Sequence, residues 1–408
     1  MRRRRTPSMP PTVYLLALAV FAQGTSEFML AGLVADISTD MRVPLSDAGL
    51  LTSAFAVGMA VGAPLMALMS RRWPRRSSLT VFLAVFALVH VLGAVTTDFG
   101  VLMTTRVLAA LANAGFMAVG LATATALVPP NAKGRALAVL LGGTTIACVA
   151  GVPAGALLGE LLGWRSAFWA VALVSLPALV AVVTSVPAGK TGNPAPAGRP
   201  SVATELGTLR RPRLLVTLVL GALVNGATFC TFTYLAPIVT DVAGIGSAWV
   251  AALLALFGVG SFLGVRTAGR LSDTRPLPLL VGGGVALLLG WVVFALAASI
   301  PAVVVALALV QGTLSFAVGG TLISQVLYAA SDAPTLGGGF ATASLNVGAA
   351  AGPWLGGIAI AAGYGLRSPL WVSALLVAGA LVVGGAAWAM VRGRAGGARP
   401  AVRETPTP

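Results

Sequence analysis

The stretch TVYLLALAVFAQGTSEFMLAGLV, residues 12–34, decides the fold of this chain. It exceeds the roughly 20 apolar residues that a helix needs to cross the hydrocarbon core of a bilayer. It is also longer than the roughly 7–15 apolar residues of a cleavable signal peptide, although four arginines precede it. It is therefore predicted to be a first membrane-spanning helix.

The composition supports the same conclusion for the whole chain. Of 408 residues, 57% are hydrophobic and only 9% are charged, whereas a soluble domain has about 25% charged residues. Lipid is therefore the expected solvent, and the fold class is an all-α integral membrane protein. Twelve stretches are long enough to span: 12–34, 47–69, 78–96, 100–124, 135–158, 165–186, 213–236, 248–269, 277–297, 301–328, 337–361 and 368–391.

The net charge of +15 is carried mainly by short loops between these stretches. Such a distribution does not form the single basic face that binds nucleic acid, so a nucleic-acid partner is not expected. Basic loops face the cytoplasm, which predicts an inner-membrane protein with both termini in the cytoplasm. The loops on that side contain Arg71, Arg72, Arg75, Arg76, Lys133, Arg135, Arg210, Arg211, Arg213, Arg266, Arg270 and Arg275.

An internal repeat organises the chain. A shift of 202 residues brings landmarks into register, among them Gln23 with Asn225, Phe55 with Phe257, Gly58 with Gly260, Gly62 with Gly264, Arg165 with Arg367 and Trp169 with Trp371. We therefore expect two pseudo-symmetric six-helix bundles, residues 12–186 and 213–391, joined by a linker at 187–212, with cytoplasmic tails at 1–11 and 392–408. Transporters built from such repeats bind substrate between them near the midplane.

Glu27 is the only one of the eleven acidic residues deep inside a predicted span. A charge at that depth costs about 2.5–3.5 kcal/mol, so it is usually functional and faces a cavity. Arg106 is the only basic residue deep in a span, and at 1.5 Å per residue both lie about 9 Å below the outer edge of the core. The two residues are expected to meet, either as a static ion pair or as an arginine that tunes proton binding by Glu27.

Sparse polar residues on helical faces, together with aromatic residues, suit a mostly apolar pocket for a small molecule. For each polar residue, an interhelical hydrogen bond is the alternative role. The candidates for substrate binding are Gln23, Asn113, Asn225, Phe229, Phe232, Gln311 and Phe316.

Other reactive side chains give little indication of chemistry. His90 is the only histidine, and a neutral interhelical hydrogen bond is favoured for it over a proton relay. Cys148 and Cys230 read as small core residues. No metal site, cofactor site, phosphate-binding loop or catalytic constellation is visible, so neither an enzyme nor an ATP-driven pump is expected.

Glycines at intervals of four residues indicate closely packed helices. They are Gly151, Gly155 and Gly159 in one segment and Gly348, Gly352 and Gly356 in another. Pro153 and Pro353 should bend these helices. The two segments are therefore either static packing surfaces or hinges that move during transport.

These features resemble the major facilitator superfamily over essentially the whole chain. Residues 269–276, GRLSDTRP, resemble its loop motif, in which the acid at Asp273 helps to hold the cytoplasmic side closed, together with Arg270. The matching first-half stretch has Arg71 in place of the acid. Arg106 resembles the helix-4 arginine of the drug:proton antiporter branch. Residues 151–155, GVPAG, and the fuller copy with Gly352 and Pro353 resemble its antiporter motif.

Longer strings are similar to the chloramphenicol-resistance exporters of that branch. These include residues 21–30, FAQGTSEFML, residues 146–153, IACVAGVP, and residues 225–230, NGATFC. The resemblance implies a monomeric antiporter that exchanges a small drug-like molecule for protons, with chloramphenicol as the expected substrate. An exporter of a sugar or an endogenous metabolite and a non-transport membrane receptor remain the alternatives.

Overall fold

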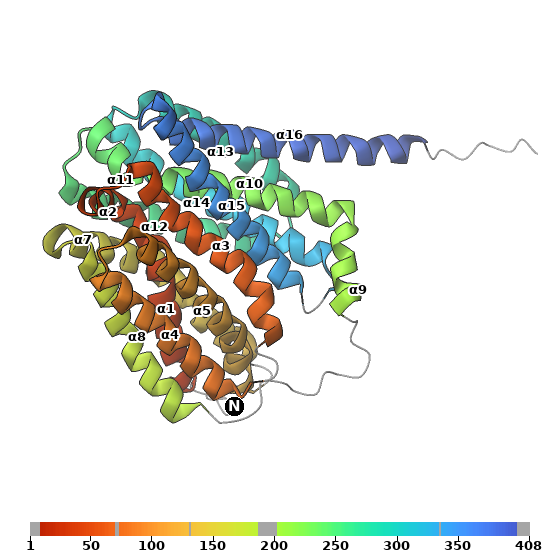
Figure 1. The fold of residues 1–408 in the computed structure, drawn as a ribbon. Helices are drawn as coiled ribbons and strands as arrows, with labels where there is room; N and C mark the ends of the chain where they lie inside the picture. The colour runs from red at the N-terminus through yellow and green to blue at the C-terminus, as the bar shows by residue number, and fades with distance from the viewer. Residues whose placement is uncertain (1–8, 70–72, 130–131, 187–201, 334–335, 398–408) are drawn as a thin grey trace, which may run out of the picture.

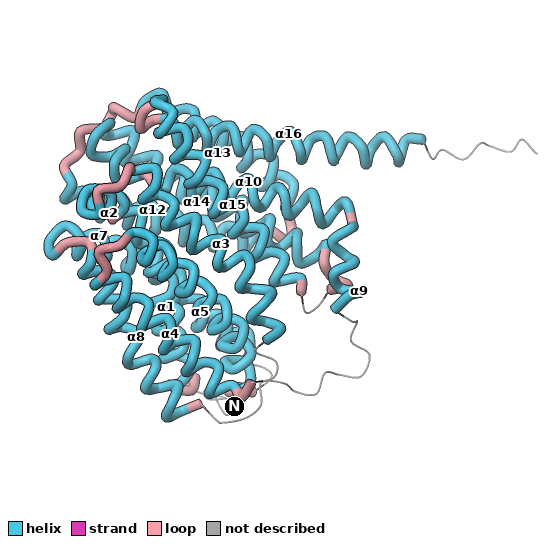
Figure 2. Tube along the Cα trace, viewed as in Figure 1, coloured by secondary structure: helices cyan, strands magenta, loops and turns pink. Residues whose placement is uncertain are grey.

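The computed structural model describes residues 9–69, 73–129, 132–186, 202–333 and 336–397. Within these ranges the chain is helical throughout, with short connecting loops and no strand (Figure 2). Among the described residues, twelve helices are long and apolar enough to cross a membrane, which confirms the predicted number. Arg71, Arg72, most of both tails and residues 187–201 of the predicted linker lie outside the described ranges.

Several spans are interrupted, and short helices lie between spans. The spans are α1 Pro11–Phe28 with η1 Met29–Gly32, α3 Leu45–Met69, α4 Arg75–Val95, α5 Phe99–Ala126, α6 Lys133–Ile146 with η4 Ala147–Gly151 and α7 Val152–Leu162, α8 Arg165–Ser185, α10 Pro212–Thr233, η7 Ser247–Trp249 with α12 Val250–Leu271, α13 Pro276–Ala297, α14 Pro301–Ala329, α15 Gly337–Ala359 with η8 Ile360–Tyr364, and α16 Ser368–Gly397. The short elements are α2 Val34–Met41, α9 Val202–Gly207, η5 Thr208–Arg210, α11 Leu235–Pro237 and η6 Ile238–Val242.

The helices form two bundles, each with its own apolar core. One core is made by buried residues between Met9 and Val186, and a second is made almost wholly by residues between Val224 and Ala380. Figure 1 shows α1, α4, α5 and α8 in one bundle and α10, α13, α14 and α16 in the other. The bundles meet where α2, α7 and α11 lie, and they diverge toward the N-terminus and α9.

Hydrogen bonds between the bundles lie at the end where the bundles meet, which we call the closed end. Ser53 Oγ in α3 donates to the Ala350 carbonyl in α15 at 2.7 Å, and Ser247 Oγ donates to Glu160 Oε1 at the end of α7 at 2.9 Å. At the opposite end, toward the start of α1 and α9, the helices of the two bundles diverge (Figure 1).

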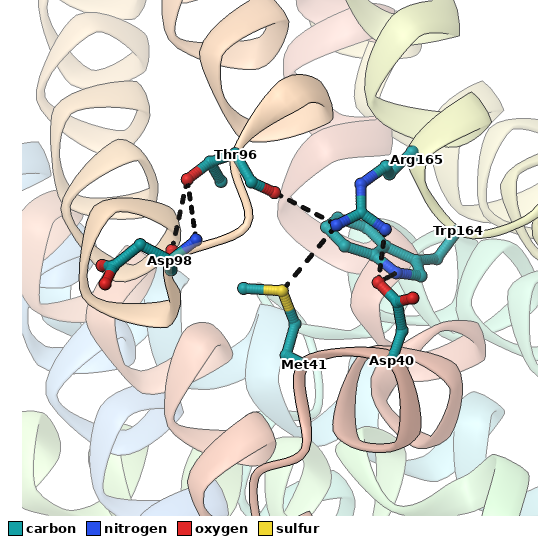
Figure 3. Close-up of polar contacts among 6 residues, drawn as sticks. All are labelled: Asp40, Met41, Thr96, Asp98, Trp164 and Arg165. Atoms are coloured by element: carbon teal, nitrogen blue, oxygen red, sulfur yellow. Dashed lines mark hydrogen bonds and ion pairs between the residues drawn. The ribbon is translucent and has the colours of Figure 1, made fainter.

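A polar cluster fixes the first bundle at the closed end (Figure 3). The Arg165 guanidinium donates to the Asp40 carboxylate and, at 3.1 Å, to the Thr96 carbonyl, so it joins α8 to α2 and to the loop after α4. It also lies over the Trp164 ring, whose Nε1 donates to Asp40 at 3.0 Å. Hydrogen bonds from Arg165 and Trp164 lower the pKa of Asp40 below its usual value.

Candidate functional site

The first span breaks in mid-membrane, and a buried arginine binds the break. The helix α1 ends at Phe28 and continues as a 3-10 turn, so the last carbonyls of α1 need partners from elsewhere. Arg106, which is 1% exposed, donates from Nη2 to the Ser26 carbonyl at 2.7 Å and from Nη1 to Ser26 Oγ at 2.9 Å. A cation is favourable at a helix C-terminus, and here it anchors α1 to α5.

His90 extends this contact into a chain of hydrogen bonds. His90 Nδ1 lies 2.7 Å from the Phe86 carbonyl, and His90 Nε2 lies 2.6 Å from Ser26 Oγ. A carbonyl can only accept, so Nδ1 carries the hydrogen and Nε2 accepts the hydroxyl hydrogen of Ser26. The predicted interhelical hydrogen bond of His90 is therefore present. Ser26, which lies beside Glu27, was not among the predicted site residues.

The predicted ion pair between Glu27 and Arg106 is absent from this conformation. The ion pairs within the described residues join Arg165 to Asp40 and Arg211 to Asp332. Glu27 is nevertheless next to the residue that Arg106 binds, and the two charges interact electrostatically. The rise per residue thus correctly predicted that the two residues lie at a similar depth in the membrane. Arg106, however, bonds to the end of α1 and leaves the half-buried carboxyl of Glu27 without an ion-pair partner among the described residues.

Aromatic rings surround the buried guanidinium. Its central carbon lies 4.6 Å from the centre of the Phe55 ring and 6.0 Å from that of Phe168, and such cation–π contacts are worth up to about 2 kcal/mol when desolvated. Arg106 Nε and both amide atoms of Gln23 are buried without a hydrogen-bond partner in the described residues. The site therefore retains unused hydrogen-bonding capacity beside Glu27.

An apolar pocket lies between the bundles next to this site. In this conformation it encloses only about 10 Å³ of free volume. Five phenylalanines dominate its lining: Phe28, Phe229, Phe232, Phe257 and Phe316. Their rings form a connected series, with centroids 5.6 Å apart for Phe28 and Phe229 and 4.8 Å apart for Phe232 and Phe257. Phe28 comes from the first bundle and the other four come from the second.

One edge of the pocket is polar and offers mainly lone pairs. Thr228 Oγ1 donates to the Val224 carbonyl at 3.0 Å, and Ser261 Oγ donates to the Gly258 carbonyl at 2.7 Å. Their hydroxyl hydrogens are thus already used, so both oxygens are left as acceptors. Cys148 completes this edge, and its thiol interacts with Ser261 and, electrostatically, with Glu27. Glu27 is not part of the lining, but its neighbour in the sequence, Phe28, is.

The aromatic and polar candidates for substrate binding separate in the structure. Phe229, Phe232 and Phe316 line the pocket, whereas the polar candidates lie outside its lining. Gln311 turns to α13, where its Nε2 donates to the Leu287 carbonyl at 3.1 Å, and Asn225 Nδ2 donates to the Leu345 carbonyl of α15 at 2.7 Å. For these two residues the alternative role, an interhelical hydrogen bond, is the one that the structure shows.

The two remaining polar candidates also lie outside the pocket lining, and the two cysteines differ in burial. Gln23 and Asn113 are buried, at 1% and 3% exposure, but neither lines the pocket. Cys230 is a buried core residue, as expected, and bonds the Pro369 carbonyl. Cys148 was expected to be one too, but it is half-buried at the pocket wall. The π-helical turn η4 that contains it shifts the helical register there, which the sequence pattern does not reveal.

The two predicted proline bends differ. Pro153 follows directly on the π-helical turn Ala147–Gly151, so the span containing it is irregular. Here Gly151 packs on Thr25, Gly155 faces Met29, and Gly258 of α12 packs on the Cys148 carbonyl so closely that it has no room for a Cβ. Close packing between the bundles therefore coincides with the first bend.

The second bend lies in a helix that stays α-helical. Pro353 is inside α15, and its carbonyl accepts a hydrogen bond from Tyr234 Oη at 3.0 Å. Gly352 packs directly on the Gly226 backbone of α10. This contact lies within the second bundle.

The loop motif at Gly269–Pro276 also makes contacts within one bundle. Asp273 accepts a hydrogen bond from Tyr328 Oη of α14 at 2.8 Å, and Arg270 is exposed. Neither residue bridges the bundles, which is consistent with separation of the bundles at this end.

Comparison with known proteins identifies the class. The family model of the Major Facilitator Superfamily matches residues 16–338, and the chain belongs to this superfamily. It is therefore a multi-pass membrane protein that transports small molecules. The chain is 58% identical over 375 residues to the chloramphenicol resistance protein of Streptomyces lividans, covering 92% of this chain and 95% of that one. It is 36% identical over 372 residues to the inner membrane transport protein YdhP of Escherichia coli K12, covering 91% and 93%.

Solved structures agree on the fold. A bacterial homologue of the human lysosomal transporter Spinster, in an inward-facing and unoccupied conformation, superimposes with a TM-score of 0.73 at 19% identity, covering 92% of this chain and 97% of that one. The occupied inward-facing form gives a TM-score of 0.70 at 18% identity. The predicted fold of two six-helix bundles is confirmed.

Proposed function

We propose that this protein exports chloramphenicol and similar uncharged aromatic molecules from the cytoplasm in exchange for protons. It acts as a monomer in the inner membrane, surrounded by lipid, with both termini in the cytoplasm. The single observation that carries the proposal is that an aromatic pocket is lined by Phe28, directly after the membrane carboxyl Glu27, which has no ion pair among the described residues. The 58% identity to a chloramphenicol resistance protein supports the choice of substrate.

The chemistry of the pocket suits this substrate. Chloramphenicol has an aromatic ring, which can pack among the five phenylalanines once their rings move apart to admit it. It also has hydroxyl and amide groups that can donate hydrogen bonds to Ser261 and Thr228, whose own hydrogens are already used. The pocket offers no cation to an anionic group in its lining. It thus favours a neutral molecule with donor groups over a carboxylate or phosphate.

The mechanism is alternating access around this pocket. With the termini in the cytoplasm, the present conformation is inward-open, so the drug enters from the cytoplasm and Glu27 releases its proton to the same side. The bundles then rock, so that Gly258 separates from the irregular segment that contains Gly151, Pro153 and Gly155, while Asp273 and Arg270 help to close the other end. A proton from outside returns the carrier. Exchange of a neutral drug for protons moves net charge, so the membrane potential drives export.

The test is accumulation of labelled chloramphenicol in cells that express the wild type, Glu27→Gln or Glu160→Gln, with and without an uncoupler. The Glu160 variant is a matched control, because it makes the same change on an exposed carboxyl and keeps the acceptor oxygen for Ser247. We expect low accumulation with the wild type and the control, and high accumulation with Glu27→Gln or uncoupler. Equal accumulation in all samples, with protein present in the membrane, would reject chloramphenicol and favour a metabolite as the substrate.

A further inference from the structure

The hydrogen-bond chain from Phe86 through His90 and Ser26 to Arg106 has a fixed direction. His90, Ser26 and Arg106 are each at most 1% exposed. The hydrogen on His90 Nδ1 goes to the Phe86 carbonyl, and the single hydroxyl hydrogen of Ser26 goes to His90 Nε2. Both lone pairs of Ser26 Oγ are then free for donors, and Arg106 uses one of them.

Without His90 Nε2 as an acceptor, no group would direct the hydroxyl hydrogen of Ser26 toward α4. A serine inside a helix readily donates its hydroxyl hydrogen to the carbonyl four residues earlier, which for Ser26 is that of Ala22. The rotation of the Ser26 side chain about its Cα–Cβ bond that makes this hydrogen bond would move the oxygen away from Arg106. The bond to the Ser26 carbonyl would remain, but half of the arginine's anchor to α1 would be lost.

A competing partner for Arg106 lies on the next residue. Glu27 has no cation in this conformation, and Arg106 Nε has no hydrogen-bond partner within the described residues. A carboxylate binds a guanidinium more strongly than a neutral hydroxyl does. The observed preference of Arg106 for Ser26 over Glu27 therefore depends on how well Ser26 is oriented.

We propose that His90 is a positioning residue that, through Ser26, holds Arg106 on the broken end of α1 and so keeps Glu27 free for protons. The inference rests on the proposed proton coupling, because it assigns His90 and Ser26 a part in it. The charged and titratable groups that act on this site are few. Arg106 and Cys148 interact with Glu27, and Glu27 and His90 interact with Arg106.

The substitutions His90→Gln, His90→Asn and His90→Leu separate this role from simple packing. The carboxamide oxygen of glutamine can take the place of Nε2 and accept from Ser26. Asparagine can still donate to Phe86 but is too short to reach Ser26, and leucine does neither. Val292→Leu is the matched control, because Val292 occupies the position equivalent to His90 in the second bundle.

The readout is the pH at which the Glu27 carboxyl titrates in purified protein, followed by the infrared absorption of the protonated carboxyl. The band is assigned by its loss in Glu27→Gln. A carboxylate paired with a cation holds its proton less firmly, with shifts of about one to three pH units. We expect titration about one unit more acidic in His90→Leu, His90→Asn and Ser26→Ala, and near the wild-type pH in His90→Gln and Val292→Leu.

This readout needs no substrate, so it stays informative if chloramphenicol proves not to be transported. The double variant Ser26→Ala with His90→Leu should titrate like either single variant, because both remove the same link. Wild-type titration in all His90 variants would overturn the proposal, whatever their transport rates. If His90→Leu does not fold, His90→Asn and Ser26→Ala against His90→Gln decide the matter on the same criterion.

Discussion

The two bundles share a scaffold but differ in chemistry at equivalent positions. In the first bundle Glu27, His90 and Arg106 form the charged site with Ser26. The equivalent positions in the second bundle, 202 residues further on, are Phe229, Val292 and Ala308. Phe229 lines the aromatic pocket, so the position of the carboxyl in one half holds an aromatic ring in the other. In the proposed mechanism the two halves therefore share a fold, while the proton binds in one half and most of the drug contacts lie in the other.

The scaffold itself repeats closely. Gly58 of α3 packs on Val107 of α5, and its equivalent Gly260 of α12 packs on Leu309 of α14. Val107 and Leu309 are themselves related by the same shift. Glycines at these helix contacts let backbones approach. Packing between helices is thus conserved where the chemistry of the site is not.

The largest effect on export is expected from a substitution of Arg106 that keeps its charge but removes its paired hydrogen bonds. Arg106→Lys keeps the charge but cannot make the two parallel hydrogen bonds to Ser26. We expect proton-coupled export to fall at least about tenfold, measured in proteoliposomes with a pH gradient. Ala308→Ser, at the equivalent position, should change export less than about twofold. Comparable losses in both variants would remove the distinction between the halves.

The next effect concerns closure. Gly258 packs on the Cys148 carbonyl with no room for a Cβ, whereas its equivalent in the first half is already Ala56. Gly258→Ala should disfavour the closed end and slow export by about tenfold, since a misfit of this kind costs about 1–3 kcal/mol. Ala56→Gly should have little effect. Labelling of Ser46→Cys from outside, in a background with both native cysteines replaced, should rise only in the Gly258 variant.

A smaller effect compares one aromatic position across the halves. Phe55 lies under Arg106, whereas its equivalent Phe257 lines the pocket. Phe257→Leu should raise KM for the drug about three- to tenfold with little change in maximal rate, because aromatic packing is worth about 0.5–1.5 kcal/mol. Phe55→Leu should lower the maximal rate and leave KM unchanged. The same kinetic change in both variants would contradict the separation of roles.

The smallest effect is at the closed end. Arg165 binds Asp40, whereas its equivalent Arg367 is exposed and forms no ion pair with the described residues. Because the pKa of Asp40 is lowered in the folded protein, this pair stabilises the fold above the unfolded pKa of about 4. The stabilisation is lost as the pH falls through the lower, folded value.

At neutral pH Arg165→Gln should therefore lower the melting temperature in detergent by about one or two degrees. The difference from the wild type should disappear at acidic pH, and Arg367→Gln should have no effect at any pH. An equal loss from both arginines would show that the cluster in Figure 3 is not what distinguishes them.

The sequence predicted the number of spans, the repeat and the level of Glu27 and Arg106, because these depend on length, hydropathy and rise per residue. It did not predict that Arg106 binds Ser26. The first span reads as one continuous apolar helix, and only the structure shows that it breaks after Phe28 and leaves a carbonyl for the arginine.

The polar candidates for substrate binding lie outside the pocket lining for a related reason. Helical spacing shows which residues share a face but not which neighbouring helix that face meets. Gln311 and Asn225 therefore turned out to bond within their own bundle. Cys148 was missed because a π-helical turn changes the register of its segment. Ser261 and Thr228 are ordinary residues in apolar helices, and only the position of the pocket distinguishes them.

In the proposed mechanism the first bundle binds the proton and the second bundle binds most of the drug. The most direct measurement is proton release upon drug binding by purified protein in weakly buffered detergent solution. We expect the wild type to release about one proton per drug molecule bound. Glu27→Gln should still bind the drug but release no proton. Phe257→Leu should bind the drug weakly but release as many protons per bound drug as the wild type when saturated. Proton release by Glu27→Gln, or a proton yield that falls in Phe257→Leu at saturation, would contradict this mechanism.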